Sequence, residues 1–241
     1  MGRAKQYDLR LIGHDTEGSA DGHIVTLSDL IHIDNQSLTR RQRMQIAFQL
    51  CLSVLQLYQT PWVDDAWNWQ ESCSLRLIEE PRDNESDNGD EEEKREFPHI
   101  FITKKFYSQG QGAPPPAKKN TTLRILAGDP VLAKLGFALI VLAVNRTLAE
   151  VRRVDKGFGD INHGEAELDD LVTAKQLLKT GRIRDEAGRA YEQVVRACIE
   201  GQYVDFQDAT KQFRKSDADN FFDDAEEAIM HPLFTCFQDF A

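Results

Sequence analysis

The chain has 241 residues, with 40 acidic and 29 basic side chains, and its net charge of -11 argues against nucleic acid and anionic membrane surfaces as partners. Hydrophobic residues at 41% and charged residues at 29% are ordinary for a globular protein, which excludes a fibre or a wholly disordered chain. The length suffices for one sizeable core, and we expect a single domain over residues 1–241.

The first predicted elements form an N-terminal β-hairpin followed by a short helix or turn. Residues 7–11 alternate polar and apolar, residues 23–27 form a second short run with two β-branched side chains, and glycines lie between them. We expect these two runs to pair as the hairpin. Residues 28–33 are then expected to form the short helix or turn.

A long amphipathic helix is predicted next. Thr39 and Gln42 have the spacing of a capping box, in which both side chains bind backbone N–H groups at a helix start. The apolar residues behind this start repeat at intervals of three and four, which places one face in the core: Ala47, Leu50, Cys51, Val54, Leu55 and Tyr58. Thr60 and Pro61 end the helix, because a residue before proline is disfavoured in the helical conformation.

Two strands separated by a long polar segment come next. Residues 74–78 and 100–103 are the predicted strands. Residues 81–97 between them are acidic and contain almost no apolar side chain, so we expect a flexible loop. A second flexible loop is expected at 108–120, where three consecutive prolines occur.

The most apolar segment of the chain begins at Asp129 and Pro130, which have the pattern of an N-cap followed by a first-turn proline. The helix continues to about Val144. It is shorter than the roughly 20 residues of a membrane span and contains Lys134, so we expect a buried core helix and no membrane span.

Further helices are expected at 165–179, 185–200 and 216–230, and His231 and Pro232 are expected to end the last one. The four cysteines, Cys51, Cys73, Cys198 and Cys236, form no C-x-x-C pair, and no apolar signal segment is present at the N-terminus. These features predict free thiols in a reducing cytoplasmic compartment. Neither a cofactor nor a metal is predicted.

Several motifs resemble a fungal family of kinase-like domains of unassigned function. They are R-R-Q-R at 40–43, L-Q-L-Y-Q-T-P-W at 55–62, W-x-W at 67–69, K-K-F at 104–106 and D-P-V-L-A-K-L-G-F-A-L at 129–139. The resemblance implies an α+β, mainly α fold, a degenerate protein-kinase large lobe with the N-terminal β-hairpin. In such a lobe a long helix, two short strands and an apolar helix follow in this order.

The resemblance also implies that catalysis has been lost. Phosphoryl transfer in kinases uses a His-Arg-Asp triplet and an Asp-Phe-Gly triplet. Residues 60–62, Thr-Pro-Trp, occupy the place of the first, and residues 103–106, Thr-Lys-Lys-Phe, the place of the second. Fewer than forty residues precede the long helix, too few for a small lobe, so we expect a protein that is not an enzyme.

Three polar residues are nevertheless the candidates for chemistry. Asp64, Asp65 and Asn68 follow the replaced triplet and have the side chains of an acid and a metal ligand. The competing interpretation is a solvated loop. A divergent phosphotransferase and a nucleotide-binding regulatory domain are accordingly the alternative functions.

Aromatic residues suggest protein interaction instead. Tryptophans cluster after the long helix and phenylalanines at the C-terminus, and both groups are expected either to pack on the body or to contact a partner: Trp62, Trp67, Trp69, Phe234, Phe237 and Phe240. Members of the resembled family are often joined to helical domains linked with prion propagation and incompatibility. The resemblance therefore implies an interaction module in fungal intracellular signalling or defence, whose partners are proteins or other domains of a longer chain.

Overall fold

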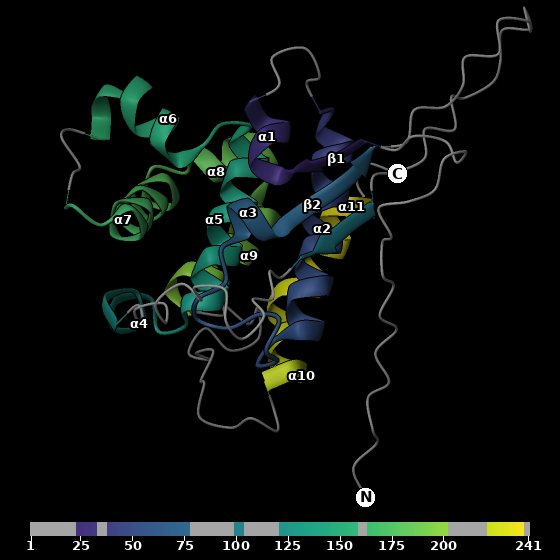
Figure 1. The fold of residues 1–241 in the computed structure, drawn as a ribbon. Helices are drawn as coiled ribbons and strands as arrows, with labels where there is room; N and C mark the ends of the chain where they lie inside the picture. Colours follow the sequence, from purple (N-terminus) through teal and green to yellow (C-terminus); the bar gives the residue numbers. More distant parts are fainter. Residues whose placement is uncertain are drawn as a thin grey trace, which may run out of the picture.

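The computed structural model describes residues 23–32, 38–77, 99–103, 121–158, 163–201 and 221–238. Within these ranges the protein is an α+β structure that is mainly helical, with one small antiparallel sheet at one side (Figure 1). The buried apolar side chains form a cluster to which both the sheet and the helices contribute.

The sheet consists of β1 (His23–Thr26), β2 (Cys73–Leu77) and β3 (His99–Ile102), with β2 in the middle and all pairs antiparallel. Val25, Leu75 and Ile100 lie opposite one another across the three strands, and Leu75 is fully buried. The predicted strands at 74–78 and 100–103 are thus confirmed.

The predicted N-terminal hairpin lies only partly within the described residues. Its second arm forms β1, which pairs with β2, while its first arm at 7–11 lies outside the described residues. The expected flexible loops at 81–97 and 108–120 also lie outside them.

Two helices follow β1 in the chain, α1 (Leu27–His32) and α2 (Arg40–Leu57). The capping box at the start of α2 is present as predicted. The backbone N–H of Gln42 donates to Thr39 Oγ1 at 3.3 Å, and the backbone N–H of Thr39 donates to Gln42 Oε1 at 2.9 Å. The helix ends before Thr60, as the proline at 61 requires.

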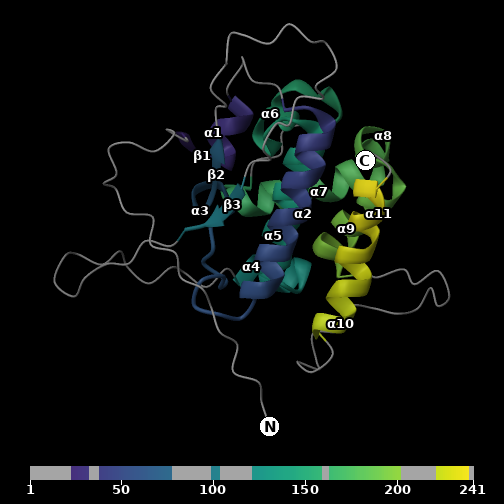
Figure 2. The same ribbon diagram turned by 90° about the vertical axis from the view of Figure 1, so that its right-hand side faces the viewer.

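Helix α5 (Pro130–Val144) runs through the centre of the described structure, with α2 and α9 (Arg189–Glu200) packed against it (Figures 1 and 2). Every residue from Pro130 to Ala143 is buried. The helix has apolar side chains on all sides, so it is stable only where protein surrounds it completely.

Gly136 allows the close approach of α5 and α9. A Cβ atom at this position would lie 2.7 Å from Ile199 Cδ1 and 3.1 Å from Cys198 Cβ, both closer than van der Waals contact permits. A larger residue at Gly136 would therefore force Ile199 or Cys198 to shift, so packing favours glycine here.

No single helix among the described residues has the length and apolar composition of a membrane span. By that criterion alone, α5 and α6 (Leu148–Val154) would qualify only as a pair, and they are bent by 57° relative to one another.

Three short helices were not predicted, namely α3 (Trp69–Ser72), α4 (Thr121–Ala127) and α6. The last of these has a capping box of its own, because Thr147 Oγ1 accepts from the backbone N–H of Glu150 at 3.3 Å. The Thr-x-x-Glu pattern was therefore a usable sequence signal. A 3-10 turn, η1 (Lys156–Phe158), follows α6.

Helix α7 (Ala166–Lys179) confirms the helix predicted at 165–179. The single helix predicted at 185–200 is instead two, α8 (Arg182–Ala187) and α9, because Gly188 between them has φ 93° and breaks the helical path. A φ of this sign is accessible to glycine at little cost.

The prediction that His231 and Pro232 end the last helix is wrong. Helix α10 (Phe221–Ala225), the π-helical turn η2 (Glu226–Met230) and α11 (His231–Gln238) follow without interruption. The backbone N–H of His231 donates to the carbonyl of Glu226, five residues back. Pro232 is the second residue of α11, and proline is tolerated in the first turn of a helical segment.

Candidate functional site

The three polar candidates lie in the segment between α2 and α3, where each holds local structure. Asp64 Oδ1 accepts from the backbone N–H of Ala66 at 3.0 Å, and Asn68 Oδ1 accepts from that of Gln70 at 3.1 Å as the N-cap of α3. Asp65 forms an ion pair with Arg124 of α4. Their oxygens are thus engaged in turns, a helix cap and a tertiary contact.

The tryptophans that surround these residues belong to the core. Trp67 and Trp69 are only 4% and 5% exposed, and Trp62 is half-buried against the same apolar cluster. The indole Nε1 of Trp67 is buried and has no hydrogen-bond partner among the described residues. Burial of the rings fits the packing alternative, so any contact of a partner with Trp67 or Trp69 has to be made from the cavity that they border.

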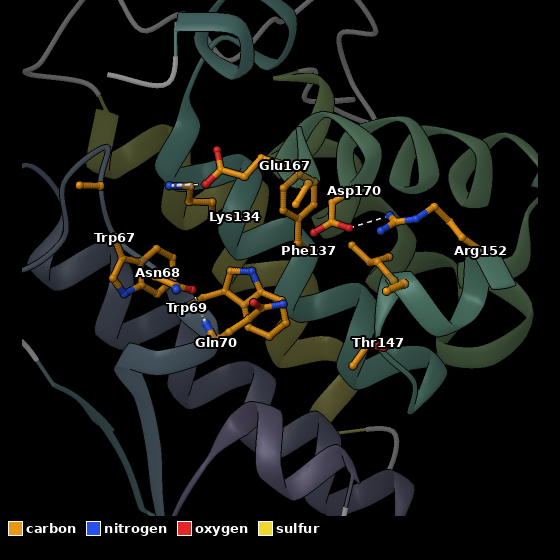
Figure 3. Close-up of a pocket in the computed structure, with 14 residues that line it drawn as sticks. Trp67, Asn68, Trp69, Gln70, Lys134, Phe137, Thr147, Arg152, Glu167 and Asp170 are labelled. Atoms are coloured by element: carbon orange, nitrogen blue, oxygen red, sulfur yellow. Dashed lines mark hydrogen bonds and ion pairs between the residues drawn. The ribbon is translucent and has the colours of Figure 1, made fainter. Parts of the chain in front are cut away.

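That cavity has a volume of about 670 Å³ and lies between the tryptophan segment and helices α5, α6 and α7. In Figure 3, Trp67, Trp69 and Gln70 lie on one side, Glu167 and Asp170 of α7 on the other, and Phe137 of α5 between them. The volume is within the range of pockets that take small molecules or a few residues of a peptide.

One ion pair at the cavity involves a lysine on the most apolar helix of the chain. Lys134 of α5 is 4% exposed, and its Nζ lies 3.1 Å from Glu167 Oε1 and donates to the backbone carbonyl of Asp65 at 2.8 Å. A buried ammonium is stable only with such partners. Lys134 therefore connects α5 to α7 and to the segment that carries the polar candidates.

A second ion pair lies across the cavity from the first. Arg152 Nη1 of α6 is 2.7 Å from Asp170 Oδ1 of α7 and 3.1 Å from Thr173 Oγ1. Burial raises the pKa of Asp170, and the hydrogen bond from Arg152 opposes that rise. The carboxylate is held by one strong donor and shielded from water, a position that suits a structural ion pair.

The charges that line the cavity balance one another. Its only charged lining residues in the described structure are two cations and two carboxylates, joined in the two pairs above. A phosphate group would have to compete with Glu167 and Asp170 for Lys134 and Arg152. The cavity therefore suits a neutral or zwitterionic group better than a polyanion.

Sequence reasoning did not identify these four charged residues as a site. The usable signal was Lys134, a lone cation in an otherwise apolar helix, which requires a buried partner. Its partner Glu167 lies 33 positions further along the chain, and nothing in the spacing indicates the pairing. Across the described ranges, no group of three or more His, Cys, Asp or Glu side chains is arranged to hold a metal ion.

The C-terminal phenylalanines lie on another part of the molecule, against α2. The rings of Phe234 and Phe237 have centroids 6.1 and 6.3 Å from that of Phe48. Phe234 remains 45% exposed, so it packs on the body and still contributes apolar surface. Phe240 lies outside the described residues.

The structure is thus mainly helical α+β, with a charge-balanced cavity and with the phenylalanine rings of α2 and α11 in contact. A family model described as a domain of unknown function, DUF7580, matches residues 9–233. The match covers most of the chain, which therefore belongs to this family. No curated protein and no solved structure matches it.

Proposed function

We propose that this protein is a non-catalytic protein-interaction module. The observation that carries the proposal is the engagement of all three polar candidates. Asp64 stabilises a turn, Asn68 caps α3 and Asp65 pairs with Arg124. A general base must instead be able to reach a substrate proton, and metal-binding carboxylates must face one another.

We further propose that the fold of this module is a degenerate kinase large lobe. The order of α2, the β2 and β3 strands, and the apolar α5 agrees with the order that the resembled kinase-like family implies. Thr60, Pro61 and Trp62 follow α2 at the place of the lost triplet. By the same resemblance, the module acts in the cytoplasm of a fungal cell, in signalling or incompatibility.

Two surfaces are available for a protein partner. One is the cavity bordered by Trp67 and Trp69, which admits a small uncharged group. The other is the pair of α2 and α11, where Phe234 stays exposed beside Phe48. We favour the second surface, because an exposed aromatic ring loses water on association whereas buried tryptophans gain little.

The competing functions are a divergent phosphotransferase and a nucleotide-binding regulatory domain, and one experiment separates all three. The thermal midpoint is measured with and without millimolar ATP and magnesium, and transfer of labelled phosphate is assayed in parallel. A nucleotide present at about a hundred times its dissociation constant would add about 2.7 kcal/mol and raise the midpoint by several degrees.

We expect neither an ATP-dependent shift nor phosphate transfer. Transfer that is lost in an Asp64→Asn, Asp65→Asn variant and kept in Asp185→Asn, an exposed change on α8, would establish an enzyme. A shift without transfer would establish the regulatory nucleotide site. Either result would overturn the proposal.

A further inference from the structure

The C-terminal helical run lies antiparallel to α2. Phe221 of α10 stacks on Tyr58 at the end of α2, with ring centroids 4.1 Å apart, while Phe234 and Phe237 of α11 contact Phe48 in the middle of α2. Contacts thus move back along α2 as the C-terminal run advances. Figure 2 shows the two segments side by side.

The outer surface of this helix pair has an apolar centre. Phe48 is half-buried, Leu52 one turn further along α2 is 40% exposed, and Phe234 of α11 is 45% exposed. Helix α2 carries no charged residue from Met44 to Leu57, and glutamines occupy the positions around Phe48 and Leu52. An uncharged exposed face of this length is unusual for a surface helix, where charged residues normally contact water.

The two ends of the same surface carry opposite charge. Arg40 and Arg41 are exposed in the first turn of α2, and Arg41 shares a helical stripe with Phe48 and Leu52 because the spacing is seven and eleven residues. The opposite end carries the acidic side chains of α10 and η2. Its exposed members are Asp223, Glu226 and Glu227.

A basic end, a neutral apolar centre and an acidic end together make a self-complementary surface. A two-fold axis that passes through the apolar centre, lies in the plane of the face and is perpendicular to the helices reverses the direction of the helix pair. It therefore brings the basic end of one copy to the acidic end of the other, twice per dimer. The same contact in a parallel arrangement would oppose like charges.

We propose that a second copy of this chain docks on the helix-pair face, defined as Phe48, Leu52 and Phe234 with Arg40 and Arg41 at one end and Asp223, Glu226 and Glu227 at the other. This inference rests on the proposed interaction function and names the partner. The chain has a net charge of -11, so two copies repel one another at long range. The local basic turn on α2 is what makes close contact at this face favourable.

The test uses two charge-reversed chains and their mixture. One carries Arg40→Glu and Arg41→Glu, and the other carries Glu226→Lys and Glu227→Lys. In a two-fold dimer each variant opposes like charges against itself, whereas the equimolar mixture restores an attractive pair at both ends. Sedimentation velocity over a concentration series measures the dissociation constant of each sample.

We expect the wild type to dimerise, each variant alone to dimerise at least about tenfold more weakly, and the mixture to regain the wild-type constant. The control variant carries Arg153→Glu and Arg189→Glu, at exposed positions on α6 and α9. Its net charge changes by as much as that of the first variant, and it should leave the dimer intact. Circular dichroism establishes that each variant is folded. A Leu52→Ser, Phe234→Ser variant should abolish dimerisation in the mixture as well.

A wild-type chain that stays monomeric at about 100 μM in low salt would overturn the inference. A mixture no tighter than its separate components would overturn it too. A monomer that instead binds a basic amphipathic peptide at this face would assign the face to another protein. The phosphate-transfer and ATP results are independent of all these outcomes, so failure of the dimer and failure of the non-catalytic function remain distinguishable.

Discussion

The hydroxyl of Tyr58 donates a hydrogen bond to the buried carboxylate of Asp129, and this contact joins the end of α2 to the start of α5. The other carboxylate oxygen of Asp129 accepts from the backbone N–H groups of Val131 and Leu132, at 2.9 and 3.1 Å. Burial, and then the charge of Asp129, raise the pKa of Tyr58, so the phenol keeps its proton and remains a donor. One side chain thus holds both a helix cap and a contact between the two central helices.

Asp129→Ala should destabilise the protein by about 2–4 kcal/mol, because it removes the cap and the hydrogen bond that the buried Tyr58 hydroxyl donates to the carboxylate. Asp129→Asn keeps an oxygen for the cap and a polar group for Tyr58, and should cost much less. Urea unfolding of the two variants measures the difference. Equal losses would show that the carboxylate matters for its charge and not for its hydrogen bonds.

Gly136→Ala should destabilise by about 1–3 kcal/mol through overpacking against Ile199, although alanine normally favours a helix over glycine. Ile199→Val removes the Cδ1 atom that the new methyl group meets. The double variant should therefore lose less stability than the sum of the two single variants. Gly157→Ala is the control, since a Cβ there has no neighbour within 4 Å. If the stability loss of the double variant equals the sum of the two single losses, the contact between the new methyl group and Ile199 is not the cause.

Glu167→Ala should cost more stability than Lys134→Met, even though both break the same ion pair. The first change leaves a nearly fully buried ammonium without its carboxylate, whereas the second replaces the ammonium with an apolar chain of similar length. We expect a loss of about 1–3 kcal/mol for Glu167→Ala, reduced from that of a fully buried pair because Glu167 is 41% exposed. Thermal unfolding shows which of the two variants is less stable. A Lys134→Met variant less stable than Glu167→Ala would contradict the assignment of Lys134 as a buried ammonium that needs its carboxylate.

Stability should fall at alkaline pH. Burial raises the pKa of the Cys73 thiol from 9.0 to about 12, so the folded protein keeps a proton that the unfolded chain releases above about pH 9. The contribution of this thiol is complete below pH 9 and declines as pH rises toward 12, by up to about 1.4 kcal/mol per pH unit.

Chemical unfolding between pH 7 and about pH 10.5 should show this decline, and Cys73→Ala should make it less steep. The decline should not vanish, because burial also raises the pKa of Cys51 and Cys198. Leu75→Ala is the control. It weakens the same strand without removing a titrating group, so its curve should run parallel to that of the wild type.

Local signals accounted for much of the fold. The starts of α2 and α5 follow from residues within one turn of each helix N-terminus, Thr39 with Gln42 and Asp129 with Pro130. The same logic would have found α6, whose Thr147 and Glu150 form an equivalent box. Gly188 carried the signal that divides α8 from α9, because a glycine inside a helical pattern favours a break.

Less of the candidate site could be predicted from the sequence, because its contacts join residues far apart in the chain. Asp65 and Arg124 are 59 positions apart, and nothing in the sequence around Asp65 indicates that its carboxylate is already paired. The burial of Trp67 likewise depends on helices much later in the chain. The residue types show which side chains could react or bind. Only the tertiary contacts show which of these side chains are already held by other parts of the protein.

The π-helical turn at Glu226–Met230 has a further consequence for evolution of the C-terminus. It holds one residue more than an α-helical turn, and each residue of an α-helix advances the chain by about 100° of rotation. Deleting one residue there would leave an ordinary α-helical turn, so Leu233 and Cys236 would stay in the core and Phe234 beside Phe48. The same deletion inside an α-helical turn of α11 would instead rotate the residues beyond it by about 100°. A change of a single codon would thus be tolerated in the π turn and would misplace the core residues of α11 if it fell in the helix itself.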